Sequence, residues 1–135
     1  MNMKNGLLAT LAVLVFMFSN TSNAADPLNK EALEKLITGN TAEGQAVEWK
    51  KGMIWYFHKL GKIKKIDEYG NKGKGEWLVN DDGYLCAKFK RGKERCRAVV
   101  PRTDDGYDIY GTDYPEADQL KWSFDRILPG NPHDL

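Results

Sequence analysis

Histidine and cysteine, which often serve as bases, nucleophiles and metal ligands, are scarce in this chain. The 135 residues include two histidines, His58 and His133, and two cysteines, Cys86 and Cys96. No Ser-His-Asp or Cys-His arrangement for nucleophilic catalysis can be assembled from them. Two cysteines without a matching histidine cluster do not predict a zinc site. We therefore expect a protein that is not an enzyme and that holds no metal and no cofactor.

The acidic stretch 104–108 resembles a calcium-binding loop at first sight. EF-hand loops take their last ligand from a glutamate at the twelfth position. Counted from Asp104, that position is Pro115. We therefore predict a hairpin turn at this stretch and no calcium site.

The cysteine spacing predicts a disulfide across a β-hairpin. Lys90-Arg91-Gly92 is a three-residue loop with glycine last, which is typical of a type I turn closed by a G1 bulge. In that register Cys86 faces Cys96 at a non-hydrogen-bonded pair, where a disulfide can span the two strands. The closed loop has 11 residues, for which chain entropy gives roughly 2.5–3 kcal/mol of stabilisation.

The other face of the same hairpin places Arg95 and Arg97 opposite Leu85, Ala87 and Phe89. If that face points inward, either arginine could bind the carboxylate or phosphate of a ligand. Because buried unpaired cations are costly, the expected arrangement is instead that the arginines extend outward over apolar neighbours.

Aromatic residues are numerous and leave two interpretations open. Large side chains can fill the interior of a small barrel, or some of them can line a cavity for a small apolar or aromatic ligand. The residues considered for such a cavity are Trp55, Phe57, Trp77, Arg95, Arg97 and Trp122.

The first 24 residues have the pattern of a signal peptide. Lys4 precedes a 12-residue apolar run, Leu7–Phe18, which is shorter than the roughly 20 residues that span a bilayer. Small residues at Ser22 and Ala24 predict cleavage after Ala24. The expected mature chain is one domain of 111 residues, 25–135, periplasmic or secreted by a bacterium and without a membrane span. An oxidising compartment of that kind suits a disulfide.

Charge is unevenly distributed along the chain. Residues 48–102 include 15 basic and 7 acidic residues, whereas residues 103–135 include 2 basic and 8 acidic residues. We expect the two segments to neutralise each other across a compact fold; the alternative is a basic surface for an anionic partner. Export and near-neutral overall charge make nucleic acid a poor candidate for that partner.

A short amphipathic helix is predicted from Asp26 to Ile37, with Asp26 as N-cap, Pro27 at the first position and Gly39 as the stop. After it, short strand-like runs alternate with glycine-containing turns. In Asp82-Gly83 we predict a two-residue hairpin turn with positive φ at both positions. The predicted strands are Gln45–Trp49, Met53–His58, Lys62–Asp67, Glu76–Val79, Tyr84–Phe89, Glu94–Val100, Gly106–Tyr110 and Lys121–Leu128. The fold class is therefore mainly β: an antiparallel meander of about eight strands forming a small barrel with a short N-terminal helix.

Several short motifs carry a family resemblance: Gly39-Asn40-Thr41, Gly75-x-Trp77, Leu85-Cys86 with Cys96, and Gly130-Asn131-Pro132. In this pattern the chain resembles a family of small exported bacterial proteins of unknown function, and more broadly the calycin or lipocalin-like architecture. The resemblance implies export, a β-rich fold and the disulfide, and it implies no activity.

Two classes of function remain from the sequence. The first is an exported, non-catalytic protein that binds an unknown small molecule inside a barrel. The alternative is an inhibitor or immunity-type protein whose partner is an exported enzyme, bound through a loop or a sheet edge. A cavity lined by tryptophan and arginine would favour the first, and a filled interior the second.

Overall fold

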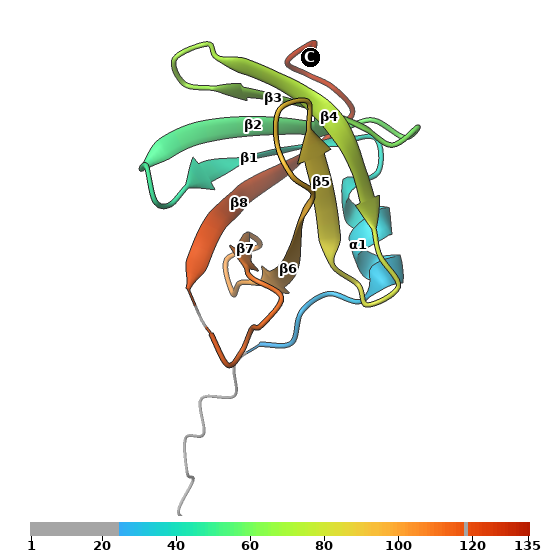
Figure 1. The fold of residues 1–135 in the computed structure, drawn as a ribbon, viewed down its shortest axis with the longest axis vertical. Helices are drawn as coiled ribbons and strands as arrows, with labels where there is room; N and C mark the ends of the chain where they lie inside the picture. The colour runs from blue at the N-terminus through green and yellow to red at the C-terminus, as the bar shows by residue number, and fades with distance from the viewer. Residues whose placement is uncertain (1–24, 118) are drawn as a thin grey trace, which may run out of the picture.

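The structure, a computed structural model, describes residues 25–117 and 119–135 as one helix and eight strands (Figure 1). The predicted signal peptide lies outside these residues. The elements are α1 (Lys30–Ile37), β1 (Asn40–Ala46), β2 (Lys51–Phe57), β3 (Lys62–Asp67), β4 (Lys72–Val79), β5 (Leu85–Phe89), β6 (Arg95–Pro101), β7 (Tyr107–Tyr110) and β8 (Leu120–Pro129). Each strand pairs antiparallel with the next, and β8 pairs with β1 to close the barrel. The predicted fold class is confirmed.

Helix α1 begins three residues later than predicted, at Lys30 instead of Pro27. Asn29 is the N-cap, and its side-chain oxygen accepts a hydrogen bond from the Ala32 amide at 2.8 Å. The preceding segment is held extended because the Leu28 amide donates to the Val99 carbonyl at 2.8 Å. Asp26 therefore cannot serve as the cap. The helix ends as predicted, with Gly39 just beyond it at a φ of +72°, a conformation that glycine adopts without steric cost.

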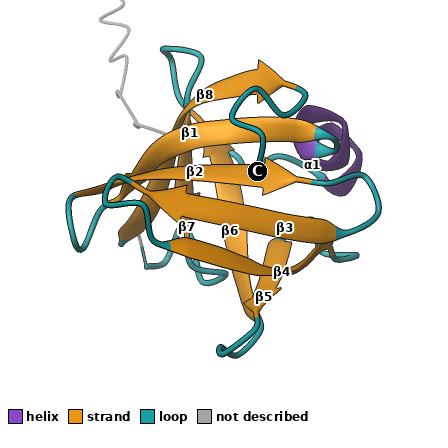
Figure 2. Cartoon of the chain, turned by 90° about the horizontal axis from the view of Figure 1, so that it is seen from above, coloured by secondary structure: helices purple, strands orange, loops and turns teal. Residues whose placement is uncertain are grey.

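The helix covers one end of the barrel. Its Leu33 and Ile37 are fully buried and belong to the same core cluster as Phe57 and Val79. Helix α1 contacts β1, which begins at this end, and β4, which ends here. Figure 2, seen from above, shows α1 beside the start of β1, and Figure 1 shows it beside the end of β4. Because the meander alternates direction, the β1–β2, β3–β4, β5–β6 and β7–β8 connections all lie at the opposite, open end.

The first strand begins five residues earlier than predicted. We predicted Gln45–Trp49, but β1 is Asn40–Ala46 and residues 47–50 form the turn that follows. Ala42 and Ala46 are buried, and a Cβ added to Gly44 would collide with the Ser123 carbonyl oxygen of β8. Small residues thus let β1 approach β8 closely at the closure of the barrel, in place of the large β-branched residues that mark most strands.

The β4–β5 and β5–β6 turns lie where they were predicted, but their turn types differ from the predicted ones. At the β4–β5 turn only Gly83 has positive φ, at +84°, and Asp82 does not. The Asn80 side chain instead accepts hydrogen bonds from the Asp82 and Tyr84 amides. At the β5–β6 turn Gly92 has no positive φ, so the predicted G1 bulge is wrong. The pairing of Cys86 with Cys96 is nevertheless confirmed, with a disulfide and a Cα–Cα separation of 4.0 Å.

Candidate functional site

The interior of the barrel is hollow toward its open end. A cavity of about 1160 Å³ extends from the core to the loops at the open end. Ligand pockets are commonly about 300–1,000 Å³, so the space is large enough for a small organic molecule. Its lining combines aromatic residues (Trp49, Trp55, Phe57, Phe89, Trp122 and Phe124) with aliphatic and charged ones.

The deep floor of the cavity is apolar. Trp55, Phe57 and Phe124 are at most 5% exposed. The Trp55 and Phe124 ring centroids lie 5.1 Å apart, and those of Phe57 and Phe124 lie 6.1 Å apart. Tilted and edge-on ring contacts at these distances are favourable. Ile63 and Leu85 are also buried at this level, so a molecule reaching the floor would contact carbon almost everywhere.

The walls and mouth are positively charged. Among the described residues the lining includes eight basic side chains and two acidic ones, Glu48 and Asp67. Asp67 is buried and paired with Lys51. Burial by itself would raise the pKa of Asp67, but hydrogen bonds from Lys51, Asn71 and the Tyr69 amide outweigh it and hold that pKa well below its usual range. The carboxylate is therefore ionised and neutralised locally, which leaves the excess of cations uncompensated.

Arg97 of β6 lies on the cavity wall beside Trp122. Its guanidinium carbon is 5.2 Å from the Trp122 ring centroid, a cation–π distance. One guanidinium nitrogen donates to the Cys96 carbonyl at 3.2 Å, while the buried Nε has no hydrogen-bond partner. Burial lowers the pKa of Arg97, and the charge of Arg95 adds to the effect. Arg97 therefore does not extend outward as expected; it lines the interior.

Lys65 of β3 also turns into the barrel. A Cβ added to Gly73 on β4 would collide with the Lys65 alkyl chain, so glycine at position 73 leaves the space in which that chain lies. The Lys65 ammonium then sits 3.9 Å from the Phe89 ring centroid on β5. Burial lowers the pKa of Lys65, and repulsion from Lys51 lowers it further.

Of the six residues considered for a cavity, five line it and one does not. Trp55, Phe57, Arg95, Arg97 and Trp122 are on the lining. Trp77 instead packs edge-on against Phe57, with ring centroids 5.5 Å apart, and its indole N–H donates to the His58 carbonyl at 3.0 Å. The lining residues that sequence reasoning did not select include Lys65, Phe89 and Phe124. Phe124 is two residues from Trp122 in the predicted strand 121–128, so alternation along that strand could have identified it.

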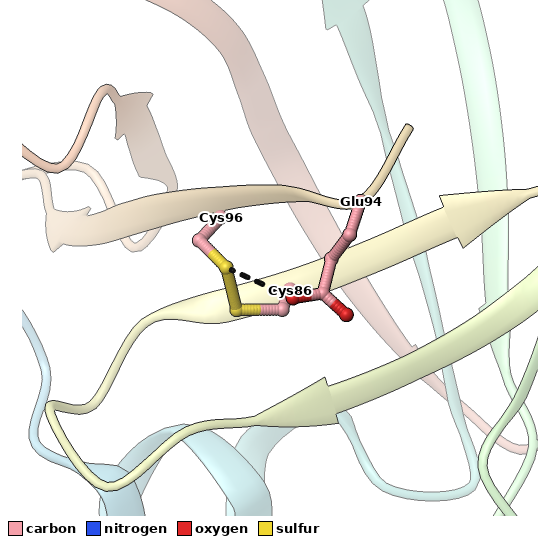
Figure 3. A group of neighbouring side chains, drawn as sticks. All are labelled: Cys86, Glu94 and Cys96. Atoms are coloured by element: carbon pink, nitrogen blue, oxygen red, sulfur yellow. Dashed lines mark hydrogen bonds between the residues drawn. A yellow bond between two sulfur atoms is a disulfide. The ribbon is translucent and has the colours of Figure 1, made fainter. Parts of the chain in front are cut away.

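The cysteines form the one group of three potential metal ligands found among the described residues. Cys86 and Cys96 lie with Glu94 in this group. Figure 3 shows the two sulfurs bonded to each other and the Glu94 carboxylate beside them, with an oxygen 3.9 Å from the Cys96 sulfur. Metal ligation requires thiolates, so disulfide-bonded cysteines do not make a metal site. Residues 85, 87, 95 and 97 face the cavity, and the disulfide therefore lies on the outer face.

Both histidines make structural contacts, His133 with Glu43 and His58 within the β2–β3 turn. His133 bonds Glu43 at 2.6 Å, and Arg126 donates to the same carboxylate at 2.7 Å. Hydrogen bonds from His133 and Arg126 lower the pKa of Glu43. They outweigh burial, which by itself would raise that pKa. These contacts fasten the C-terminal segment to β1. His58 accepts a hydrogen bond from the Leu60 amide within the β2–β3 turn.

Fold and cavity together define a class of protein: a small antiparallel up-and-down barrel with a hollow interior open at one end. Comparison with family models, curated proteins and solved structures finds no match to this chain. Among the described residues, no helix combines the length and apolar character needed to cross a membrane.

Proposed function

We propose that this is an exported, non-catalytic protein that binds a small apolar molecule inside its barrel. The cavity carries the proposal. An eight-stranded barrel is just wide enough to be filled by its own side chains or to hold one small ligand. Here about 1160 Å³ remains open above a floor of buried aromatic rings. A lining of tryptophan and arginine is also the feature that favours a binding protein over an interaction protein.

Export is part of the same proposal. The signal-peptide pattern of residues 1–24 supports it, and so does the disulfide between Cys86 and Cys96. Disulfides persist in the periplasm and outside the cell and are rare in a reducing cytosol. A binding protein in that compartment would meet small apolar molecules before they reach the inner membrane.

Fluorescence titration with N-phenyl-1-naphthylamine tests the binding proposal. This neutral aromatic amine is dim in water and bright in an apolar site. We expect saturable binding to the exported protein. Ala87→Trp should weaken it about tenfold or more, because Ala87 lines the cavity and a larger ring would occupy the space.

Leu78→Trp is the matched control for the bulk that Ala87→Trp adds. Leu78 lies on β4 and is 48% exposed on the outer surface. We expect Leu78→Trp to bind the probe as the unsubstituted protein does. Probe binding that is absent, or that survives Ala87→Trp unchanged, would refute a ligand site in the barrel.

A partner protein is the second candidate, and exposed apolar side chains at the open end favour it. Trp49 in the β1–β2 turn is 69% exposed, and Tyr69 in the β3–β4 turn is 77% exposed. Affinity capture from an extract of exported proteins, with Trp49→Ser as control, separates the two functions. A stoichiometric partner lost in Trp49→Ser, together with no probe binding, would favour the inhibitor or immunity-type function.

A further inference from the structure

Apart from Lys51, which pairs with Asp67, the cations considered inside the barrel form no ion pair, whereas arginines on the outside do. Arg102 contacts three carboxylates, those of Asp104, Asp108 and Asp125. Arg126 pairs with Glu43. Within the described residues, no carboxylate forms an ion pair with Arg97, Arg95 or Lys65, although all three line the cavity. The interior thus retains positive charge that the chain itself does not neutralise.

Arg97 is the interior cation that is best prepared to bind an anion. Its ring contact with Trp122 and its bond to the Cys96 carbonyl fix the orientation of the guanidinium. Its buried Nε still lacks an acceptor. A buried donor without a partner is costly and rare in folded proteins, and a guanidinium edge accommodates carboxylate-like groups with two parallel hydrogen bonds. An incoming anion would accept hydrogen bonds from the guanidinium group and balance its charge.

The apolar floor limits what the rest of the ligand can be. Trp55, Phe57 and Phe124 are buried side by side there. A polar body would lose its water against these rings without gaining hydrogen bonds, whereas an apolar body would gain from the burial. A highly charged molecule therefore fits the mouth but not the interior.

We propose that the ligand is an anionic amphiphile: a small apolar body carrying one negatively charged group, with that group bound by Arg97 and the body contacting Trp55, Phe124 and Trp122. Lys65, three strands away around the barrel, adds favourable charge from the other wall. This inference rests on the proposed function, because it assigns a chemical class to the ligand of the same cavity.

A matched pair of probes tests the negative group separately from the apolar body. 8-Anilino-1-naphthalenesulfonate has the aromatic skeleton of N-phenyl-1-naphthylamine plus one sulfonate. We expect the sulfonate to bind more tightly at low salt and to lose affinity severalfold at high salt, whereas the neutral probe keeps its affinity. Dodecanoate should displace the sulfonate at lower concentration than dodecan-1-ol, which extends the test from a sulfonate to a carboxylate.

Arg97→Met and Arg95→Met form the matched pair of variants. Both remove one positive charge from the same strand, but Arg95 is exposed at the mouth and Arg97 is half-buried. We expect Arg97→Met to weaken sulfonate binding about tenfold or more and to leave the neutral probe within about twofold. Arg95→Met should weaken sulfonate binding no more than about threefold.

The outcomes separate this inference from the proposed function. Binding of neither probe would overturn both. Neutral-probe binding with no preference for the sulfonate, or equal losses in Arg97→Met and Arg95→Met, would overturn the anionic ligand alone. If Arg97→Met fails to fold, the salt dependence of the two probes in the unsubstituted protein decides: sulfonate affinity that is unchanged by salt would contradict the proposal.

Discussion

The guanidinium carbon of Arg97 lies 5.2 Å from the centroid of the Trp122 ring. The two residues belong to β6 and β8, so the contact reaches across the four-residue strand β7. It places a cation and the edge of the apolar floor side by side in one cavity, since the Trp122 ring is also 6.2 Å from that of Trp55. A ligand with both an apolar and an anionic part would meet both surfaces at this point.

Replacing the ring at Trp122 tests how far this contact supports both folding and binding. We expect Trp122→Leu to lower the free energy of unfolding by about 1–2 kcal/mol, because packing and a cation–π interaction are lost. It should weaken the neutral probe severalfold, because the ligand loses contact area with the indole ring. Trp122→Phe should have a stability and a probe affinity between those of the unsubstituted protein and Trp122→Leu. Urea denaturation and probe titration measure the effects; unchanged binding in Trp122→Leu would remove Trp122 from the site.

Removal of the disulfide should lower stability without changing the site. We expect the double variant Cys86→Ala with Cys96→Ala to lose roughly 2.5–3 kcal/mol of unfolding free energy, because the denatured chain is no longer closed into an 11-residue loop. Probe affinity below the melting temperature should stay the same, since the sulfurs lie outside the barrel. Loss of binding in a folded double variant would contradict that placement.

The lowered pKa of Asp67 should make the stability of the fold depend on pH. The pKa of Asp67 is lower in the folded protein than in the unfolded chain, where it is about 3.9. The unfolded state therefore binds more protons as the pH falls below about 4, and the stabilisation from Asp67 is present above that value and lost below it. Asp67→Asn should be less stable at neutral pH and should show a weaker acid dependence between about pH 5 and pH 2.

Thermal denaturation across that pH range compares the two proteins. Asp104→Asn is the control, because Asp104 is an exposed carboxylate that also pairs with an arginine. Hydrogen bonds from Arg102 and the Gly106 amide also lower the pKa of Asp104, but solvent screens this exposed carboxylate, so we expect Asp104→Asn to lose less of the acid dependence than Asp67→Asn. An acid dependence that is the same with and without Asp67 would show that other carboxylates set it.

Gly44 predicts a strong steric effect at the closure of the barrel. Gly44→Ala should lower the free energy of unfolding by about 2 kcal/mol or more, because the new Cβ would collide with the Ser123 carbonyl. Gly52→Ala is the matched control: its Cβ would lie 3.6 Å from that of Glu68, an ordinary contact. We expect that variant to be within about 0.5 kcal/mol of the unsubstituted protein. Equal stability of the two variants would contradict the close approach of β1 and β8.

Local patterns in the sequence were sufficient for the barrel and the disulfide. Glycine turns at regular spacing predicted the meander, and β3 was predicted with its observed bounds, Lys62–Asp67. The cysteine pairing was correct even though the predicted turn type was not, since the pairing depends on the alignment of the strands and survives a change of φ at Gly92. β1 was misplaced because alanine and glycine, which close packing against β8 requires, carry no strand pattern of their own.

The cavity could not be predicted from the alternation of residues along single strands, because it depends on packing between strands. In β3 the inner face carries Ile63, Lys65 and Asp67, so the strand lacks a clean apolar face. Lys65 and Asp67 are charged and lie on the cavity wall, where most of the charged side chains are cations. The position of Lys65 depends on the space over Gly73 in another strand, and no single stretch of sequence shows that relationship.

Indole resonances test most directly whether a ligand enters the barrel. The chain has four tryptophans, which give four indole N–H signals in a proton–nitrogen correlation spectrum, assignable by Trp→Phe variants. With saturating N-phenyl-1-naphthylamine we expect the Trp55 and Trp122 signals to shift strongly, and the Trp77 signal, bonded to the His58 carbonyl, to stay nearly in place. Probe binding that shifts neither Trp55 nor Trp122 would contradict a ligand site inside the barrel.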